Sequence, residues 1–232
     1  MFTLIYLLLL IALVVFSWIG SVYGIMLPDA TVLPNLLSAD SVRWFVRHAI
    51  DNMADAPFVE VVLVLMMISA AEQSGLWNTL ITTLRRHVRS SLSRQQKFAL
   101  HVSVTLFAVC VLIVLVGLVG PRGNLLSVTG RIAGGPFASG WLPLLNVCVC
   151  LSCLSYGWLV GLWRTERDVL KAFTSTIARC SGYFVTLIVA SQLMAVVQYL
   201  HLLDLLGWGE VSMLPIITVV YGLPLIVSLV RD

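Results

Sequence analysis

Residues 155–173 read SYGWLVGLWRTERDVLKAF, and this stretch changes character halfway along. An apolar run ends at Arg164, and five of the eight residues from Arg164 to Lys171 are charged. Of the 232 residues of the chain, 59% are hydrophobic and 11% are charged, whereas soluble domains have roughly 45–50% and 25%. A border of this kind is typical of an apolar helix that leaves a membrane. The sequence therefore predicts an all-α integral membrane protein.

About six apolar segments are long enough to cross a hydrocarbon core as helices, because such a crossing needs about 20 residues. Pro215, Gly222 and Pro224 should bend or interrupt the last of them. The segments between the spans are too short for a soluble domain, so we predict one transmembrane domain over the whole chain. The expected spans are residues 2–26, 57–76, 98–120, 141–163, 182–203 and 211–230.

The basic residues predict how the chain is oriented, because short cytoplasmic loops are enriched in Lys and Arg. One basic loop lies between residues 85 and 97, and a second lies between residues 164 and 179, two crossings later and hence on the same side. We expect that side to be the cytoplasm, with both termini there as well. A cleaved signal peptide is the alternative for residues 2–26, but this run follows no Lys or Arg and exceeds the roughly 7–15 residues of a signal sequence.

Residues 38–52 carry a different pattern from the spans. Ser38 can cap a helix, and apolar residues then recur at three- and four-residue spacing from Val42 to Ala49. We predict an amphipathic helix that lies flat at the outer membrane surface. A lid over a transport pathway is the functional alternative, and interfacial packing is favoured because no other sequence feature supports a lid.

Four polar side chains in the expected spans are candidates for a substrate or ion pathway, because a charge at the bilayer centre costs roughly 2.5–3.5 kcal/mol. Glu60 and Glu72 fall near the two ends of one span, so an interfacial group that keeps its water is the simpler interpretation of each. Gln192 and Gln198 lie six residues apart on different faces of an apolar helix, so each needs a partner on a neighbouring helix. Interhelical hydrogen bonding is favoured there over substrate contact.

Two glycine pairs and the cysteines are interpreted as packing groups. Gly20 with Gly24, and Gly157 with Gly161, have the spacing that lets helix backbones approach closely. Thiols in or near spans pack as small apolar groups, so we predict no metal site and no cofactor. The common hydrolase and nucleotide-binding motifs do not occur, and we expect neither an enzyme nor a nucleic-acid partner. The cysteines are Cys110, Cys148, Cys150, Cys153 and Cys180.

The segment APFVEVVLVLMMISAAEQSGL, residues 56–76, resembles the second-helix region of the AbgT family, the p-aminobenzoyl-glutamate transporters. It has a similar Ala-Pro start and a similar Glu-x-Ser-Gly-Leu finish. Residues 156–169 are similar to the family's Tyr-Gly-x-x-x-Gly and the charged turn after it, with Asp168-Val169 in that turn. Residues 36–52 look like the family's outer segment, and Ala190-Ser-Gln192 is similar to its Ala-Gln-Phe motif with one residue inserted or changed.

The resemblance implies a secondary transporter of p-aminobenzoyl-glutamate or a related aromatic carboxylate, coupled to protons or sodium. It also implies a bacterial inner membrane and a homodimer. Members of that family are longer and carry two re-entrant hairpins that form their substrate and ion site. Between Leu76 and Phe98 this chain has only a short basic loop where the first hairpin is expected, and beyond Gly207 it has one Pro-containing span where the second is expected. The alternative is therefore a non-transporting dimeric scaffold, or a half-transporter, that binds a partner membrane protein or lipid.

Overall fold

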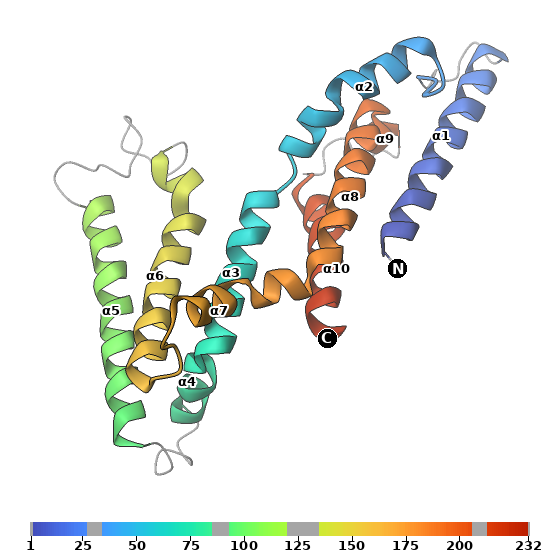
Figure 1. Ribbon diagram of the computed structural model, residues 1–232. Coiled ribbons are helices and arrows are strands. Elements are labelled where there is room, and N and C mark those ends of the chain that lie inside the picture. The colour runs from blue at the N-terminus through green and yellow to red at the C-terminus, as the bar shows by residue number, and fades with distance from the viewer. Residues whose placement is uncertain (1, 27–33, 85–92, 120–134, 206–212, 232) are drawn as a thin grey trace. The chain divides into compact units, whose positions relative to one another are not determined.

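The structure is a computed structural model, which describes residues 2–26, 34–84, 93–119, 135–205 and 213–231 (Figure 1). All regular structure in these residues is helical, which confirms the all-α prediction. Five stretches among them are long and apolar enough to cross a membrane, and Pro215–Val230 forms a shorter apolar helix. The basic residues 85–92, which the topology prediction used, lie outside the described residues. The chain divides into two compact units, with unit 1 comprising Met1–Phe58 and Cys180–Asp232 and unit 2 comprising Val59–Arg179.

Unit 1 is assembled on α8 (Ser181–Tyr199), which is the most buried of the candidate spans. A buried apolar cluster joins Leu13 to Leu193, Val196 and Leu200. Because these side chains come from opposite ends of the sequence, the cluster holds the first helix of the chain against the eighth. The helices that pack around α8 are α1 (Phe2–Met26), α2 (Ala39–Ala54), α9 (Leu202–Leu205) and α10 (Leu214–Arg231).

α1 and α2 form where the sequence predicts helices. α2 begins directly after Ser38, whose hydroxyl accepts a hydrogen bond from the Ser41 amide at 3.3 Å. α2 then packs against α8, where the ring of Trp44 stacks on that of Tyr199 with centroids 4.1 Å apart. The amphipathic helix is therefore present with one side taken up by α8, and its place at the outer membrane surface stays a prediction.

α10 occupies the segment in which we expected a bend or an interruption. The helix runs from Leu214 to Arg231 without a break, so an interruption is wrong, while a bend stays a prediction. Pro224 cannot donate a backbone hydrogen bond to the carbonyl of Val220, four residues earlier. The hydroxyl of Tyr6 donates to that carbonyl instead, at 2.8 Å. A side chain from α1 thus replaces the hydrogen bond that the proline removes.

Unit 2 contains two long helices side by side, α5 (Arg94–Val119) and α6 (Pro136–Val160) (Figure 1). Ala99, Leu100 and Tyr156 form a buried cluster between them. Beyond Ser103 no described residue of α5 is buried. The later part of α5 thus presents apolar side chains that unit 2 itself leaves uncovered. The remaining helices are α3 (Phe58–Ser74), α4 (Leu76–Leu84) and α7 (Glu166–Arg179).

Gly75 separates α3 from α4. Its φ angle is 70°, in the left-handed region, where glycine avoids the strain that a Cβ atom causes. The hydroxyl of Ser74 accepts a hydrogen bond from the Leu76 amide at 3.2 Å and so supports the start of α4. The apolar span therefore ends at this turn, close to its expected end at residue 76.

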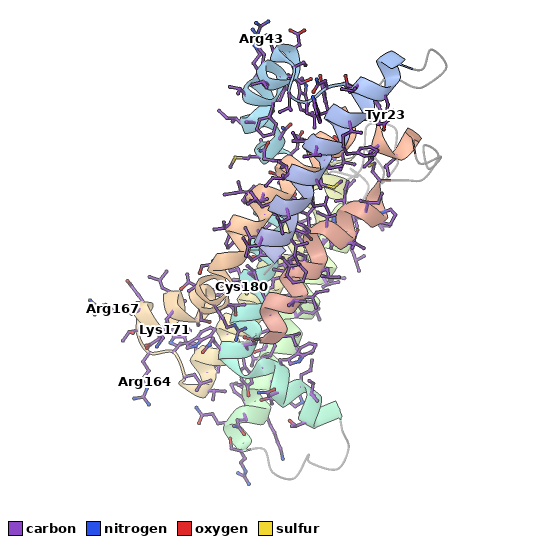
Figure 2. The ribbon with its side chains drawn as sticks, turned by 90° about the vertical axis from the view of Figure 1, so that its right-hand side faces the viewer. Tyr23, Arg43, Arg164, Arg167, Lys171 and Cys180 are labelled. Atoms are coloured by element: carbon purple, nitrogen blue, oxygen red, sulfur yellow. The ribbon has the colours of Figure 1, made fainter. Side chains whose placement is uncertain are left out.

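α7 is a helix in a segment that we interpreted as a loop. Thr165 and Asp168 cap it reciprocally: the Asp168 amide donates to the Thr165 hydroxyl at 3.3 Å, and the Thr165 amide donates to the Asp168 carboxylate at 3.0 Å. Its buried side chains are Ala172 and Thr176, four residues apart on one face. The charged border is thus the start of an amphipathic helix. Three basic side chains project outward there (Figure 2): Arg164, Arg167 and Lys171.

Candidate functional site

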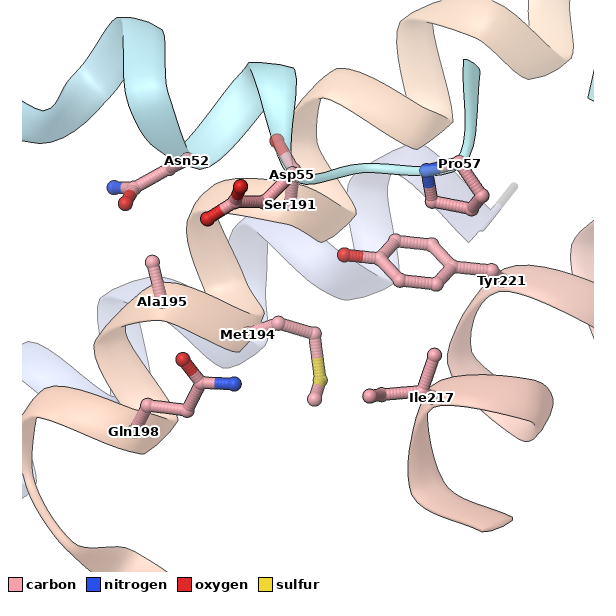
Figure 3. A pocket seen from close by; sticks show the side chains of 9 residues that line it. All are labelled: Asn52, Asp55, Pro57, Ser191, Met194, Ala195, Gln198, Ile217 and Tyr221. Atoms are coloured by element: carbon pink, nitrogen blue, oxygen red, sulfur yellow. The ribbon is translucent and has the colours of Figure 1, made fainter. Parts of the chain in front are cut away.

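A cavity of about 210 Å³ lies within unit 1, where the end of α2 meets α8 and α10 (Figure 3). A cavity of about 150 Å³ is known to hold one benzene molecule, so this volume accommodates a ring-sized solute. One part of the wall is apolar and is formed by Pro57, Met194, Ala195 and Ile217. The polar part is formed by Asn52, Asp55, Ser191, Gln198 and Tyr221.

Three of the polar groups face a common space. Figure 3 shows the hydroxyl of Tyr221, the carboxylate of Asp55 and the amide of Gln198 directed into the opening between the helices. Within the described part of the chain, none of these three head groups has a hydrogen-bond or ion-pair partner. The hydroxyl of Ser191, by contrast, donates to the carbonyl of Ile188 at 2.8 Å. Three polar groups are therefore left available to a ligand.

The local sequence explains why Asp55 stands at this edge. Its backbone amide bonds to the carbonyl of Asp51 at 2.9 Å, which makes it the last residue to join the α2 ladder. Pro57 follows two residues later, and a proline disfavours helical geometry in the residue before it. α2 therefore stops here, and the Asp55 side chain is left at its carboxyl end.

Tyr221 is positioned by a second contact between helices. The hydroxyl of Tyr183 in α8 donates to the backbone carbonyl of Tyr221 in α10 at 2.8 Å. Together with the bond from Tyr6 to Val220, this contact fixes the turn of α10 that carries the Tyr221 ring. The Tyr221 ring is thus positioned through the backbone of α10, and its hydroxyl forms no hydrogen bond with a described residue.

Gln192 finds the partner helix that the sequence requires, and that helix is α2. Its amide nitrogen donates to the carbonyl of Ala49 at 3.0 Å, and its amide oxygen accepts from the side chain of Asn52 at 3.3 Å. Both ends of the amide are therefore used in joining α8 to α2. Gln198 differs, since it is exposed and lines the cavity.

Glu72 lies in unit 2 and is paired. Its carboxylate accepts from the guanidinium of Arg179 at 3.2 Å and from the hydroxyl of Thr176 at 3.4 Å. The side chain of Glu72 is 46% exposed and that of Arg179 is 34% exposed. Ion pairs with this exposure contribute roughly 0–1 kcal/mol to stability. The contact therefore orients the acid more than it stabilises the fold. Glu60 is exposed in the first turn of α3 and forms no ion pair with a described residue.

Gly157 and Gly161 shape the end of α6. Gly161 ends α6 with a φ angle of 80°, and its amide returns to the carbonyl of Gly157. A Cβ atom on Gly157 would lie 2.7 Å from the ring of Trp163, so glycine is needed for that ring to fold back. Gly20 and Gly24 lie in the last turns of α1, and close approach of a second helix there stays a prediction.

Of the residues that line the cavity, only Gln198 was predicted from the sequence, and Asp55 and Tyr221 are among those that were missed. Asp55 lies between the predicted helix at residues 38–52 and the predicted span at residues 57–76. The available signal was an acidic residue directly before Ala56-Pro57. Tyr221 had no such signal, because only the packing of α10 on α8 brings it to the cavity. The four predicted candidates fall into separate groups: Gln192 and Gln198 in unit 1, and Glu60 and Glu72 in unit 2. Among the described residues there is no group of His, Cys, Asp and Glu side chains suited to a metal ion.

Two solved structures are similar to the chain in fold. One, described as the Alcanivorax borkumensis YdaH transporter with an unusual topology, has a TM-score of 0.73 and 16% identity, and covers 94% of this chain and 74% of that chain. The other is Neisseria gonorrhoeae MtrF, described as illuminating a class of antimetabolite efflux pumps. Its TM-score is 0.69 and its identity 13%, over 84% of this chain and 68% of that chain. No curated protein sequence matches the chain.

The sequence profile of the AbgT putative transporter family matches the chain in two pieces, residues 2–93 and 85–231. Together the two pieces include both units and nearly every residue of the chain. The helical fold with several candidate membrane spans agrees with this match. The chain is therefore a multi-pass membrane protein that belongs to the AbgT transporter family.

Proposed function

We propose that the chain is a secondary transporter of p-aminobenzoyl-glutamate or a related aromatic carboxylate, driven by a proton or sodium gradient. The family match over residues 2–93 and 85–231 carries this proposal. The description of MtrF as an antimetabolite efflux pump supports it. From the family match we also propose a bacterial inner membrane and a homodimer. The Lys and Arg residues that gather in two loops support the proposal that both termini lie in the cytoplasm.

The test is a flux measurement with the purified full chain in liposomes. Uptake of p-aminobenzoyl-glutamate and of p-aminobenzoate is followed with and without an imposed proton or sodium gradient, and empty liposomes are the control. Gradient-dependent flux of either solute supports the proposal. Absence of flux, from protein shown to be helical and monodisperse, contradicts it.

A half-transporter or scaffold is the second candidate, and one observation favours it. The two pieces of the family match overlap at residues 85–93, so the match is interrupted within the basic stretch. In the family, the first substrate-binding hairpin is expected at this place, and this chain has only a short basic segment there. Such a protein would give flux only with a partner membrane protein, so restoration of flux by a co-expressed partner would separate the two functions.

Variants can separate direct roles in transport from structural roles. Glu72→Gln removes the carboxylate and its ion pair, whereas Arg179→Gln removes the same ion pair and keeps the carboxylate. Loss of flux in the first variant alone assigns the carboxylate to the pathway, and equal loss in both assigns the pair a structural role. Gln198→Leu and Glu60→Gln test groups with no described partner, and unchanged flux removes either from the pathway.

Gln192→Leu should impair flux, because it removes the two hydrogen bonds that the glutamine forms with α2. The fold should stay intact, since the Ser41–Tyr199 hydrogen bond and the stacking of Trp44 on Tyr199 still hold α2 against α8. Asn52→Ala is its matched control, because this variant breaks one of the two bonds and leaves the glutamine in place. Loss of flux in Gln192→Leu at unchanged unfolding stability supports a role of the glutamine in transport, whereas a loss of flux that follows the loss of stability in both variants assigns the glutamine a structural role. Unchanged flux in Gln192→Leu removes it from the site.

A further inference from the structure

We propose that the cavity in unit 1 binds a small organic cation, an ammonium group attached to a ring or a short apolar chain. Among the described residues that line the cavity, the carboxylate of Asp55 is the charged group, and no Lys or Arg contributes. In the part of the chain that the structure describes, no cation forms an ion pair with Asp55. The exposed Asp55 carboxylate therefore gives the pocket a negative charge that favours a cation over an anion.

The position of Asp55 on its helix strengthens this charge preference. Asp55 is the C-cap of α2, where the backbone carbonyls carry partial negative charge. A carboxylate there opposes the helix dipole, so it is not placed for the stability of α2. Arg43 of the same helix pairs with Asp40 instead, at 3.8 Å. A cation in the cavity interacts favourably with the carboxylate and with the helix end together.

The other free polar groups suit an ammonium donor. An ammonium group has several N–H donors and no acceptor, so it needs oxygen acceptors around it. The hydroxyl oxygen of Tyr221 points toward the same opening as the Asp55 carboxylate, and the side-chain amide of Gln198, which contains a further acceptor, lines the pocket as well (Figure 3). The polar groups of three different elements thus line one pocket.

The size and the apolar wall favour an organic cation over a metal ion. Hard metal ions take oxygen ligands on all sides, and the thioether of Met194 and the side chain of Ile217 cannot supply them. The same two side chains pack well against hydrocarbon or an aromatic ring. A volume of about 210 Å³ also leaves room for a ring beside the charged group.

The test uses benzylammonium, benzyl alcohol and benzoate, which are similar in size and differ in charge. Binding to the full chain in non-ionic detergent is measured by isothermal titration, with protein-free micelles as the blank. We expect benzylammonium to bind and the other two solutes to bind at least about tenfold more weakly, because a hydrogen bond to a charged group contributes roughly 1.5–3 kcal/mol.

Two variants and one control assign the binding to the cavity. Asp55→Asn should weaken benzylammonium binding about tenfold, and Tyr221→Phe should weaken it by a smaller factor while filling the same space. Asp51→Asn removes an exposed acid of the same helix that does not line the cavity, and should leave the affinity unchanged. Far-UV circular dichroism and size-exclusion profiles show that each variant is folded.

Three results would overturn the proposal. The first is benzoate binding as tightly as benzylammonium. The second is benzylammonium binding that neither Asp55→Asn nor Tyr221→Phe alters. The third is Asp55-dependent binding of sodium without any binding of benzylammonium. Since no gradient or transport is involved, the assay gives an answer even if p-aminobenzoyl-glutamate is not carried.

Discussion

The hydroxyl of Tyr6 donates a hydrogen bond to the backbone carbonyl of Val220, at 2.8 Å. This is the carbonyl that Pro224 leaves without its helical donor. The first and last helices of the chain are therefore joined at the position where α10 would otherwise have an unpaired polar group. This contact explains how an apolar helix retains a proline in its interior.

Tyr6→Phe should lower the free energy of unfolding by about 1 kcal/mol, because it leaves the Val220 carbonyl without a donor. Pro224→Ala restores a backbone donor for that carbonyl, so Tyr6→Phe should cost less in the Pro224→Ala background. Thermal unfolding in detergent, followed by circular dichroism in a double-mutant cycle, measures the difference. If Tyr6→Phe costs the same in both backgrounds, the Tyr6 hydroxyl does not compensate for the proline.

Ser69→Ala should weaken the attachment of α7 to α3. The Ser69 hydroxyl donates to the carbonyl of Ala172 at 2.5 Å and accepts from the amide of Thr176 at 3.2 Å, and it is fully buried. We expect a loss of about 1 kcal/mol in unfolding free energy. Thr174→Ala is the control, because that hydroxyl is exposed and bonds within its own helix. Equal effects of the two substitutions would contradict the assignment.

Gly157→Ala should destabilise unit 2 by about 1–3 kcal/mol, since the added methyl group meets the Trp163 ring. The emission of Trp163 should change as well, because the ring must move. Gly140 lies in the same helix and has open space around it. Gly140→Ala should therefore raise the free energy of unfolding by about 0.5–1 kcal/mol. Chemical unfolding of both variants checks the opposite signs, and a loss of similar size in both would refute the packing argument.

The start of α7 should depend on pH through Asp168. The Thr165 hydroxyl, together with the backbone amides of Thr165 and Arg164, holds the pKa of the Asp168 carboxyl below its usual value. A depressed pKa means that the cap stabilises the fold above the unfolded-state pKa of about 4, and that this stabilisation is lost as pH falls through the lower folded value.

The comparison that checks this dependence is between the unchanged protein and Asp168→Ala. Their unfolding midpoints should differ by a constant amount above about pH 5 and converge as the pH falls below about 4. Glu166→Ala, an exposed acid in the same turn, is the control. A difference between the protein and Asp168→Ala that persists at low pH argues against a charged cap.

The sequence predicts those helices whose signals are local. The uninterrupted apolar run of α1 and the cap at Ser38 each specify a boundary within a few residues. α7 was missed because its buried positions, Ala172 and Thr176, are small or polar and so resemble a solvated loop in a hydropathy profile. For α10 a bend or an interruption was expected, because the sequence shows Pro215, Gly222 and Pro224. The sequence does not show that the Tyr6 hydroxyl will donate to the carbonyl that Pro224 leaves without a donor.

The candidate site is less predictable for the same physical reason. That Gln192 needs a partner follows from the cost of an unpaired amide in an apolar helix. The identity of that partner, Asn52 with the Ala49 carbonyl, depends on packing between distant segments. Asp55 and Tyr221 come together in the same way, and no periodicity along either segment indicates it.

The bond between Gln192 and α2 also bears on the order of synthesis. A ribosome makes the chain from its N-terminus, so Ala49 and Asn52 exist long before Gln192 emerges. The residues that pair with this glutamine have therefore been synthesised before α8 emerges, so the amide can find its partners as soon as α8 reaches them. α5, by contrast, carries no buried polar contact beyond Ser103, and its apolar surface suits release into the bilayer without a waiting partner. Assembly of unit 1 is thus set up to finish late in translation, with the C-terminal helices closing onto N-terminal ones that were inserted first.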